Sequence, residues 1–396
     1  MALTVYVEIG ADPVFGNNTD VTANVVAMSI SEGRSSPLER FSPTQITIDL
    51  DNSAGTYDTP GSQLQKGGYV SVGVDVGNWV GIRLSTVSPA FGAVFGGRIT
   101  SMVQRIGLSY NVLSITAALS YDSDLVFNTT TTPVNTSGML TFLANTTEPN
   151  ATQAGADIGV AATVTVAATT TVLELFQSVA DVSRGVGFAY YNGTTSTQYG
   201  YRSMRGRAID RVALGSVPVF GNADDNTEIP CWDVELVKSD DALITSCTLD
   251  GTAFGVAGSS ATYSSSTAAS TYGRRPLSRS SPQPNASLAS WAQTLVGVFG
   301  TPRFVVRSLT TNGRWVPDAA WAHLLNPAWC GGCAINIRTV NGALYTGAYY
   351  IESRDLTFGA DGDLEVRLGV ATISYGGVSG VYDSTTNGYY DACVYQ

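Results

Sequence analysis

The sequence predicts a mainly β fold with minor α, in which an α+β region separates two related β-barrel domains. Three observations lead to this prediction. Charged residues make up only 13% of the chain, whereas Gly, Ser, Thr and Asn are abundant. Short segments alternate apolar and polar residues between turn signals, as the strands of barrels and sandwiches do. One of these segments recurs near the other end of the chain.

The composition favours strands and turns over helices. β-branched Thr and Val fit pleated surfaces, whereas Gly and Asn suit turns. Hydrophobic residues make up 44% of the 396 residues, which is ample for packed cores and argues against disorder. A chain of this length exceeds what one core usually serves, so we expect several domains.

The first part of the chain is predicted to form antiparallel strands. Residues 46–50 alternate apolar and polar side chains, and so do residues 70–76 and 80–84. Turn signals separate these segments. They are Asp51-Asn52-Ser53-Ala54-Gly55, Thr59-Pro60-Gly61 and Gly77-Asn78.

The middle of the chain changes character, because helical spacing appears there. One helix is predicted to begin near Thr170 or Thr171, a suitable N-cap, and to end before Gly185. A second is predicted over residues 287–298, and a short helix over 140–143. The apolar stripes of the two longer helices are expected to pack against a sheet. The stripes consist of Leu173, Phe176, Val179 and Ala180, and of Leu288, Trp291, Leu295 and Val298.

An internal repeat supports the two β-domains. Residues 80–99 and 333–349 each combine an Ile-Arg strand with a turn and a glycine-rich hexamer, Gly-Ala-Val-Phe-Gly-Gly or Gly-Ala-Leu-Tyr-Thr-Gly. Each is followed by an alternating return strand, at 112–116 and at 364–368. Matching flanks on both sides of the hexamer indicate a duplicated fold, which is a separate matter from function.

The domain boundaries follow from this repeat. We predict a first β-barrel domain at 1–121, an α+β intermediate domain at 122–235, and a second β-barrel domain at 236–270 and 300–375. An inserted helical segment is predicted at 271–299 and a C-terminal tail at 376–396.

The charge and hydropathy exclude some function classes. A net charge of -11 does not suit a sequence-seeking nucleic-acid binder, which needs a clustered basic face. The acidic charge could instead line a passage through which DNA slides without binding, or it could simply keep a β-rich protein soluble. No apolar run is long enough to span a membrane, and the N-terminus lacks a signal-peptide pattern. We therefore expect assembly in a cytoplasm.

Cysteine chemistry is the first catalytic candidate. The five cysteines do not describe a disulfide scaffold. Cys330-Gly331-Gly332-Cys333 resembles a redox motif, but it leads directly into a strand rather than a helix, so a structural role is favoured over a disulfide, a metal site or redox activity. A zinc site would need distant help from Cys231, Cys247 or Cys393.

The other catalytic candidates are weak. His323 is the only histidine, and its apolar surroundings indicate packing. The acid pairs Asp224-Asp225 and Asp240-Asp241 could serve a glycosidase, although such pairs are usually solvated turn residues. Residues 359–363 read as a hairpin loop without the ligand spacing of a calcium loop. We therefore assign no catalytic, cofactor-binding or metal-binding residue, and we expect no enzyme activity and no cofactor.

Three segments carry a family resemblance. Residues 29–58, SISEGRSSPLERFSPTQITIDLDNSAGTYD, resemble a segment of the minor tail proteins of siphophages. Residues 187–193 with Tyr201-Arg202-Ser203 resemble the hairpin and closing Arg of that family, and residues 270–276 resemble its Ser-x-x-Tyr-Gly-x-Arg segment. The matching positions of the first segment are Gly33, Arg34, Leu38, Arg40, Phe41, Leu50, Asp51, Asn52, Tyr57 and Asp58.

The resemblance implies a hub at the tail tip, or baseplate, of a long-tailed bacteriophage. In that family two related tail-tube-like β-barrel domains per subunit form a homotrimeric ring with six barrel positions, which joins a six-fold tail tube to a three-fold tip. It implies contacts with a distal tail or tail-tube protein, the tape measure protein, and tip, fibre or receptor-binding proteins. It also implies a place at the virion tail tip and a part in host attachment and genome ejection. Arg40 and Asp51 are expected to shape the fold.

An alternative from another class is a glycan-directed tail-tip protein, either a receptor binder or a cell-wall hydrolase. Tyrosines could stack on sugar rings in such a protein. The candidates are Tyr349, Tyr350, Tyr389 and Tyr390.

Overall fold

The computed structural model shows a mainly β protein, which confirms the predicted fold class. It describes residues 4–10, 17–35, 39–57, 79–85, 91–118, 153–156, 173–174, 177, 186–191, 197–202, 218–222, 228–238, 243–250, 260–280, 285–302, 305–313, 324–325, 331–359 and 363–372.

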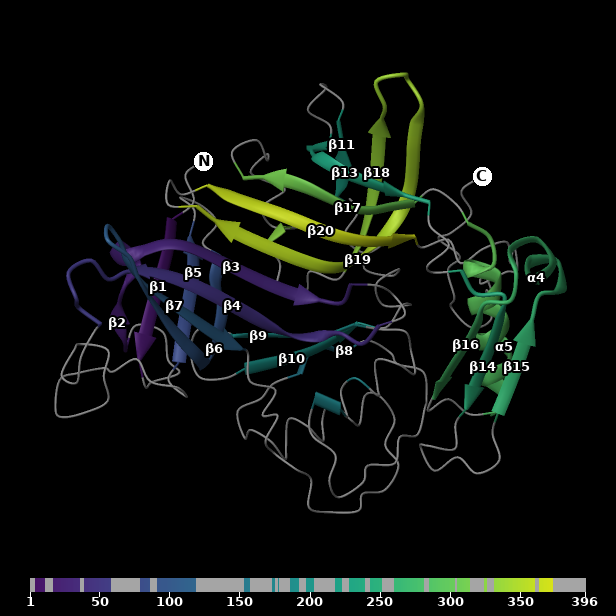
Figure 1. Ribbon diagram of the computed structural model, residues 1–396, viewed down its shortest axis with the longest axis horizontal. Coiled ribbons are helices and arrows are strands. Elements are labelled where there is room, and N and C mark those ends of the chain that lie inside the picture. The colour runs from purple at the N-terminus through teal and green to yellow at the C-terminus, as the bar shows by residue number, and fades with distance from the viewer. Residues whose placement is uncertain are drawn as a thin grey trace, which may run out of the picture.

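One large sheet of 14 strands dominates the described part of the chain. Two of its members, β3 and β19, lie side by side at its centre (Figure 1). The strands are β1 (Thr4–Gly10), β2 (Thr19–Asp20), β3 (Val25–Gly33), β4 (Ser42–Asp51), β5 (Trp79–Ser85), β6 (Phe91–Ile106), β7 (Asn111–Ala118), β11 (Val219–Gly221), β12 (Ile229–Pro230), β13 (Trp232–Val237), β17 (Val305–Asn312), β18 (Gly332–Arg338), β19 (Leu344–Phe358) and β20 (Leu364–Thr372).

The large sheet divides into two units with the same strand succession. In the N-terminal unit the order is β3-β4-β7-β6-β5-β1-β2, and in the C-terminal unit it is β13-β17-β20-β19-β18-β11-β12. The units differ at one end, because β1 pairs antiparallel with β5, whereas β11 pairs parallel with β18. In the N-terminal unit β1 and β5 run across the direction of β3 and β4, so the sheet curls (Figure 1).

The two units also share an irregularity in register. The pairing of β6 with β7 shifts between Ile99 and Ser101, and the pairing of β19 with β20 shifts between Ile351 and Ser353. A β-bulge bends a strand at a fixed place, so we use it to align the units. Ser101 is thus equivalent to Ser353, and the residues that follow in β6 and β19 correspond one by one.

This alignment corrects the hexamer match seen in the sequence. Gly97 lies four residues before Ser101, and Tyr349 lies four residues before Ser353, so Gly97 is equivalent to Tyr349 rather than to Gly347. The reason is local. β6 has register shifts opposite Ile82–Leu84, whereas β19 pairs with β18 without a shift.

A single hydrophobic core runs through both units. Core residues alternate along the strands, because successive side chains of a strand point to opposite faces of the sheet. The buried side chains of β4 are thus Thr44, Ile46, Ile48 and Leu50, and those of β20 include Leu364, Val366 and Leu368. The predicted strands at 46–50, 80–84, 112–116 and 364–368 all lie within observed strands, namely β4, β5, β7 and β20.

Two smaller sheets accompany the large one. Strands β8 (Gln153–Ala156), β10 (Thr197–Arg202) and β9 (Val186–Tyr191) form one of them, and β9 contacts β3, β4 and β6. Strands β15 (Ser260–Ser264), β14 (Ser246–Asp250) and β16 (Pro276–Ser280) form the other. Although β14 belongs to the predicted second barrel domain, it pairs with β16 of the predicted inserted segment, and the division into domains remains a prediction.

Two helices accompany the sheet of β14, β15 and β16 (Figure 1). Helix α4 (Ser266–Tyr272) is capped by Ser265, whose side chain accepts the amide of Ala268, and it ends at Gly273, whose φ of 81° favours glycine. Helix α5 (Asn285–Phe299) confirms the predicted helix and packs on β14 and β15. Of the predicted stripe, Leu288 and Leu295 are buried and Trp291 is partly buried.

Several predicted features lie outside the described residues. Leu173, Glu174 and Gln177 are helical, but the rest of the predicted helix near Thr170 is not described. The strand at 70–76, the turns at 59–61 and 77–78, the helix at 140–143 and the tail at 376–396 also lie outside. No helix in the described ranges is long and apolar enough to cross a membrane.

Candidate functional site

The junction between the two units is the candidate functional site. Strand β3 pairs antiparallel with the second half of β19, from Gly33 opposite Ser353 to Met28 opposite Phe358. This pairing makes one sheet of the two units, although their strands are far apart in the sequence.

Four buried charged side chains flank the pair of Gly33 and Ser353. Arg354 Nη2 lies 2.6 Å from Glu32 Oε2, and Arg34 Nε lies 2.6 Å from Glu352 Oε2. The arrangement is reciprocal, because Glu32-Gly33-Arg34 faces Glu352-Ser353-Arg354 in the opposite direction. Each strand thus contributes one carboxylate and one guanidinium, and the charges balance.

Further hydrogen bonds complete the surroundings of these charges. Arg354 Nε also donates to Glu32 Oε2 at 2.9 Å, and its Nη1 donates to the Leu324 carbonyl at 2.7 Å. The Arg34 amide donates to the Glu352 carbonyl at 2.9 Å. Burial raises the pKa of Glu32, while the Arg354 guanidinium and a hydrogen bond from Thr44 oppose this shift.

The ion pairs determine the register of the two units. A slip of two residues in one direction would place Arg34 opposite Arg354, and in the other direction it would place Glu32 opposite Glu352. A slip of one residue would turn the core side chains outward. Unpaired buried charges are costly, so each alternative is strongly disfavoured. We infer that this arrangement serves to hold the units in one register rather than to catalyse a reaction.

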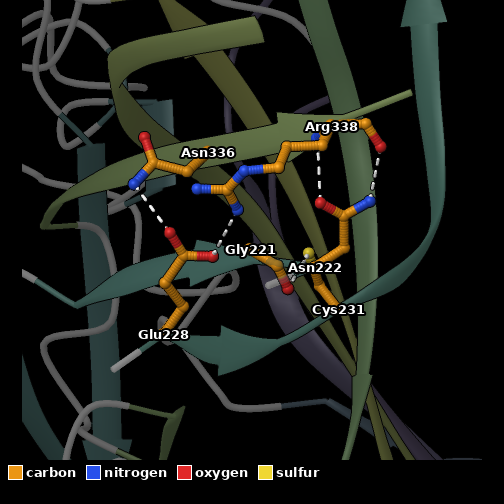
Figure 2. Close-up of polar contacts among 6 residues, drawn as sticks. All are labelled: Gly221, Asn222, Glu228, Cys231, Asn336 and Arg338. Carbon is orange, nitrogen blue, oxygen red and sulfur yellow. Dashed lines mark hydrogen bonds and ion pairs between the residues drawn. The ribbon is translucent and has the colours of Figure 1, made fainter. Parts of the chain in front are cut away.

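A second polar cluster lies where β11, β12 and β18 meet (Figure 2). Glu228 accepts a hydrogen bond from Asn336 Nδ2 at 2.9 Å and lies 3.7 Å from Arg338 Nη1. Asn222 Nδ2 donates to the Arg338 carbonyl at 2.7 Å, and its Oδ1 accepts the Arg338 amide at 2.8 Å. These contacts hold Asn222 and Glu228 against β18.

Gly221 and Cys231 complete this cluster. A Cβ atom at Gly221 would lie 1.7 Å from Glu228 Oε2, so any other residue at this position would force the carboxylate to move. The Cys231 amide and thiol both lie within hydrogen-bonding distance of the Gly221 carbonyl. Burial, assisted by the nearby Glu228 carboxylate, raises the pKa of Cys231 to about 12, so its thiol is protonated at neutral pH.

The resemblance segment at 29–58 lies at the junction. Gly33 adopts a φ of 98°, which favours glycine, and Arg34 forms one of the buried ion pairs. Phe41 and Leu50 belong to the core. Leu38 and Asp58 lie outside the described residues.

The end of this segment forms a tight turn. Asn52 is fully buried. Its backbone N–H donates to the Asn111 carbonyl, and its side-chain Oδ1 accepts a hydrogen bond from the backbone N–H of Tyr57. Asp51 Oδ1 accepts the Ser53 amide at 2.8 Å. Hydrogen bonds from Ser53 lower the pKa of Asp51. Arg40 is exposed, and the fold-shaping role expected of Arg40 and Asp51 remains a prediction.

The residues weighed for catalysis do not come together in the described part of the chain. Cys333 is buried in β18, and Cys247 belongs to the separate core beneath α5. Within the described ranges no group of three or more potential metal ligands occurs. Outside those ranges lie Cys330, Cys393, His323, Asp224, Asp225, Asp240, Asp241, Tyr389 and Tyr390.

The structure contradicts the predicted sugar-stacking role of two tyrosines. Tyr349 and Tyr350 are buried in β19, with exposed fractions of 6% and 2%. Their rings are therefore not accessible to a glycan.

Sequence reasoning missed three members of the junction, namely Glu32, Glu352 and Arg354. A signal was present, since Glu32 follows Met28 and Ile30 on the apolar side of its strand, and Arg354 precedes Leu356 and Phe358. Charged residues at core-facing positions of two strands suggest buried partners. The pairing of those strands was not visible in the sequence.

Comparison with known proteins found a shared fold. No family model and no curated protein matches the chain. A tail protein from Neisseria meningitidis MC58 superposes with a TM-score of 0.57 at 12% identity, over 93% of this chain and 97% of that one. The 43 kDa tail protein of prophage MuSo2 from Shewanella oneidensis gives a TM-score of 0.56 at 11% identity, over 94% and 99% of the two chains. The chain therefore has the fold of these tail proteins over almost its whole length.

Proposed function

We propose that the chain is a structural tail-tip, or baseplate, hub of a long-tailed bacteriophage. The observation that carries this proposal is the pair of β-units with one strand succession, in a chain whose fold matches two tail proteins over nearly their full lengths. The resemblance of residues 29–58 to siphophage minor tail proteins supports the same conclusion.

In this proposal three chains form a closed ring. Each chain supplies two related units, so three chains supply six similar positions around one axis. Such a ring can face a six-fold tail tube on one side and a three-fold tip on the other. The contacts between chains would be heterologous, as closed rings require.

The partners follow from this position. A distal tail or tail-tube protein would bind one face of the ring, tip, fibre or receptor-binding proteins the other, and the tape measure protein the channel. The net charge of -11 suits a channel that DNA passes without sticking. The ring would assemble in the host cytoplasm, lie at the virion tail tip, and take part in host attachment and in opening the path for genome ejection.

The solution mass and particle shape test this proposal. We expect light scattering of the purified full chain to give three times the 41.5 kDa chain mass, independent of concentration. Negative-stain electron microscopy of the same sample should show rings with six lobes. A chain that stays monomeric over the whole concentration series, or particles without three-fold symmetry, would contradict the ring.

A further inference from the structure

The turn between β6 and β7 is apolar and exposed to solvent. Ile106 is 72% exposed, Leu108 is fully exposed and Tyr110 is 56% exposed. Val103, which precedes them in β6, is 51% exposed. Exposed turns are usually built from Gly, Pro, Asn, Asp and Ser, and a cluster of large exposed apolar side chains marks an interaction site.

The other unit shows that the fold does not require these side chains. By the bulge alignment Gly107 is equivalent to Gly359, and each glycine amide donates to a carbonyl across its turn, that of Tyr110 or that of Asp363. The turn at 359–363 reads Gly-Ala-Asp-Gly-Asp, whereas the turn at 107–110 reads Gly-Leu-Ser-Tyr. Polar residues can therefore close this hairpin, so the apolar ones serve a contact outside the unit.

The apolar side chains surround the tip of the hairpin instead of forming a patch on one face. Met102 packs against the core, so by alternation Ile106 lies on the core-facing side of β6 and Val103 on the opposite side. The Tyr110 ring lies over Gly107, where an added Cβ would come within 2.3 Å of Tyr110 Cε1. A protein partner of fixed shape would cover one face, whereas lipid chains can surround an inserted tip.

Charged residues stop at one level of the hairpin. Arg105 pairs with Val112, and Val112 pairs with Asp51 at the end of β4. Beyond this row, neither the turn at 106–111 nor the neighbouring turn at 52–57 contains a charged residue. A strand advances about 3.3 Å per residue, so the tip at Leu108 extends roughly 10 Å past the charged row. Interfacial segments enter a bilayer to a depth of about 5–10 Å, which matches this length.

We propose that the β6–β7 turn inserts into the headgroup and upper acyl region of a lipid bilayer, with Leu108 deepest and the row of Arg105 and Asp51 at the water side. The inference goes beyond the proposed hub and does not rest on it. The turn offers one basic residue in a chain of net charge -11, so apolar burial drives the binding rather than attraction to anionic lipids. Tyr110 suits the interface, because its ring is apolar and its hydroxyl can stay among the headgroups.

Flotation with vesicles tests the insertion. The full chain is mixed with an excess of large unilamellar vesicles of pure phosphatidylcholine and floated through a density gradient. We expect the wild type to float with the vesicles at low and at high salt alike, because the contact is apolar and salt screens only charges. Leu108→Asp should reduce the bound fraction by about ten-fold or more, since its carboxylate would have to leave water.

Val340→Asp is the matched control. Val340 is also fully exposed at the end of a hairpin, that of β18 and β19, but it lies between the polar residues Thr339 and Asn341 and close to the exposed Arg338. This change should leave flotation as it is in the wild type. Thermal unfolding of both variants should match the wild type, because neither side chain is covered in the folded chain, so a loss of flotation cannot be ascribed to unfolding.

A tryptophan probe locates the tip independently. Leu108→Trp and Val340→Trp each add one tryptophan to the six of the chain. The vesicles are made from phosphatidylcholine that is brominated in the upper part of its acyl chains, where bromine quenches only nearby tryptophans. We expect quenching of the fluorescence that Leu108→Trp adds to the wild-type signal, and none of the fluorescence that Val340→Trp adds.

The outcomes separate lipid from a protein partner. A wild type that floats, a Leu108→Asp variant that does not, and quenching at position 108 support the insertion. A wild type that stays unbound, flotation that is lost at high salt, or a Leu108→Asp variant that floats like the wild type overturns it and leaves a protein pocket as the occupant of the tip. The trimer mass is measured separately by light scattering, so failure of the insertion leaves the proposed hub standing, and failure of the hub leaves the insertion standing.

Discussion

Glu32 and Arg354 lie on strands from opposite ends of the chain, yet their charged atoms are 2.6 Å apart and their side chains are 5% and 2% exposed. With the reciprocal pair of Arg34 and Glu352, they form a small ionic core where the two β-units meet. Burying four charges is costly, and the cost is offset only while every charge has its partner.

The first prediction follows from this dependence. Glu32→Leu should lower the free energy of unfolding by about 3–5 kcal/mol, because it leaves the Arg354 guanidinium buried without its carboxylate. The double variant Glu32→Leu with Arg354→Leu should be more stable than Glu32→Leu alone. Urea unfolding of Glu32→Leu, of Arg354→Leu and of the double variant gives the coupling free energy between the two residues. If the two single losses simply add in the double variant, the pair does not act as a unit.

This junction shows what the sequence could and could not predict. The alternation at 46–50 and 112–116 predicted strands correctly, because the period of two is a local property. The Gly33-Arg34 motif marked the right place, but the partner of Arg34 lies at Glu352, 318 residues away. No local pattern encodes which strands pair at such a separation. The hexamer match failed by two residues for a similar reason, because the register shifts of β6 are set by pairing with β5.

The second prediction concerns the buried thiols. Burial raises the pKa of Cys231 to about 12 and that of Cys247 to about 11, so neither is a thiolate at pH 8. We expect both to resist iodoacetamide at pH 8 in the native protein and to react readily in denaturant, as read by peptide mass spectrometry. Rapid native alkylation of Cys231 would mean that the cluster around Gly221 opens easily.

The third prediction tests the close contact in that cluster. Gly221→Ala would place a methyl group on Glu228 Oε2 and should cost about 1–3 kcal/mol of unfolding free energy through overpacking. Gly331→Ala is the matched control, since no atom lies within 4 Å of its added Cβ. Denaturant unfolding of both variants checks the difference. Equal stability of the two would show that Glu228 moves aside at little cost.

The fourth prediction concerns pH and the turn after β4. Hydrogen bonds from Ser53 lower the pKa of Asp51 below its ordinary value, so the native state prefers the ionised carboxylate. A carboxyl whose pKa is depressed on folding contributes stability above its unfolded pKa, and this contribution is lost as the pH falls through the folded pKa. Asp51→Asn should therefore unfold at a lower temperature than the wild type at pH 7. The gap between the two melting temperatures should begin to narrow below about pH 4, where the unfolded carboxyl takes up its proton, and should close as the pH falls through the lower pKa of the folded state. A gap that stays constant from pH 7 to pH 3 would show that the charge of Asp51 does not contribute, and that the turn is held by Asn52 and the surrounding backbone.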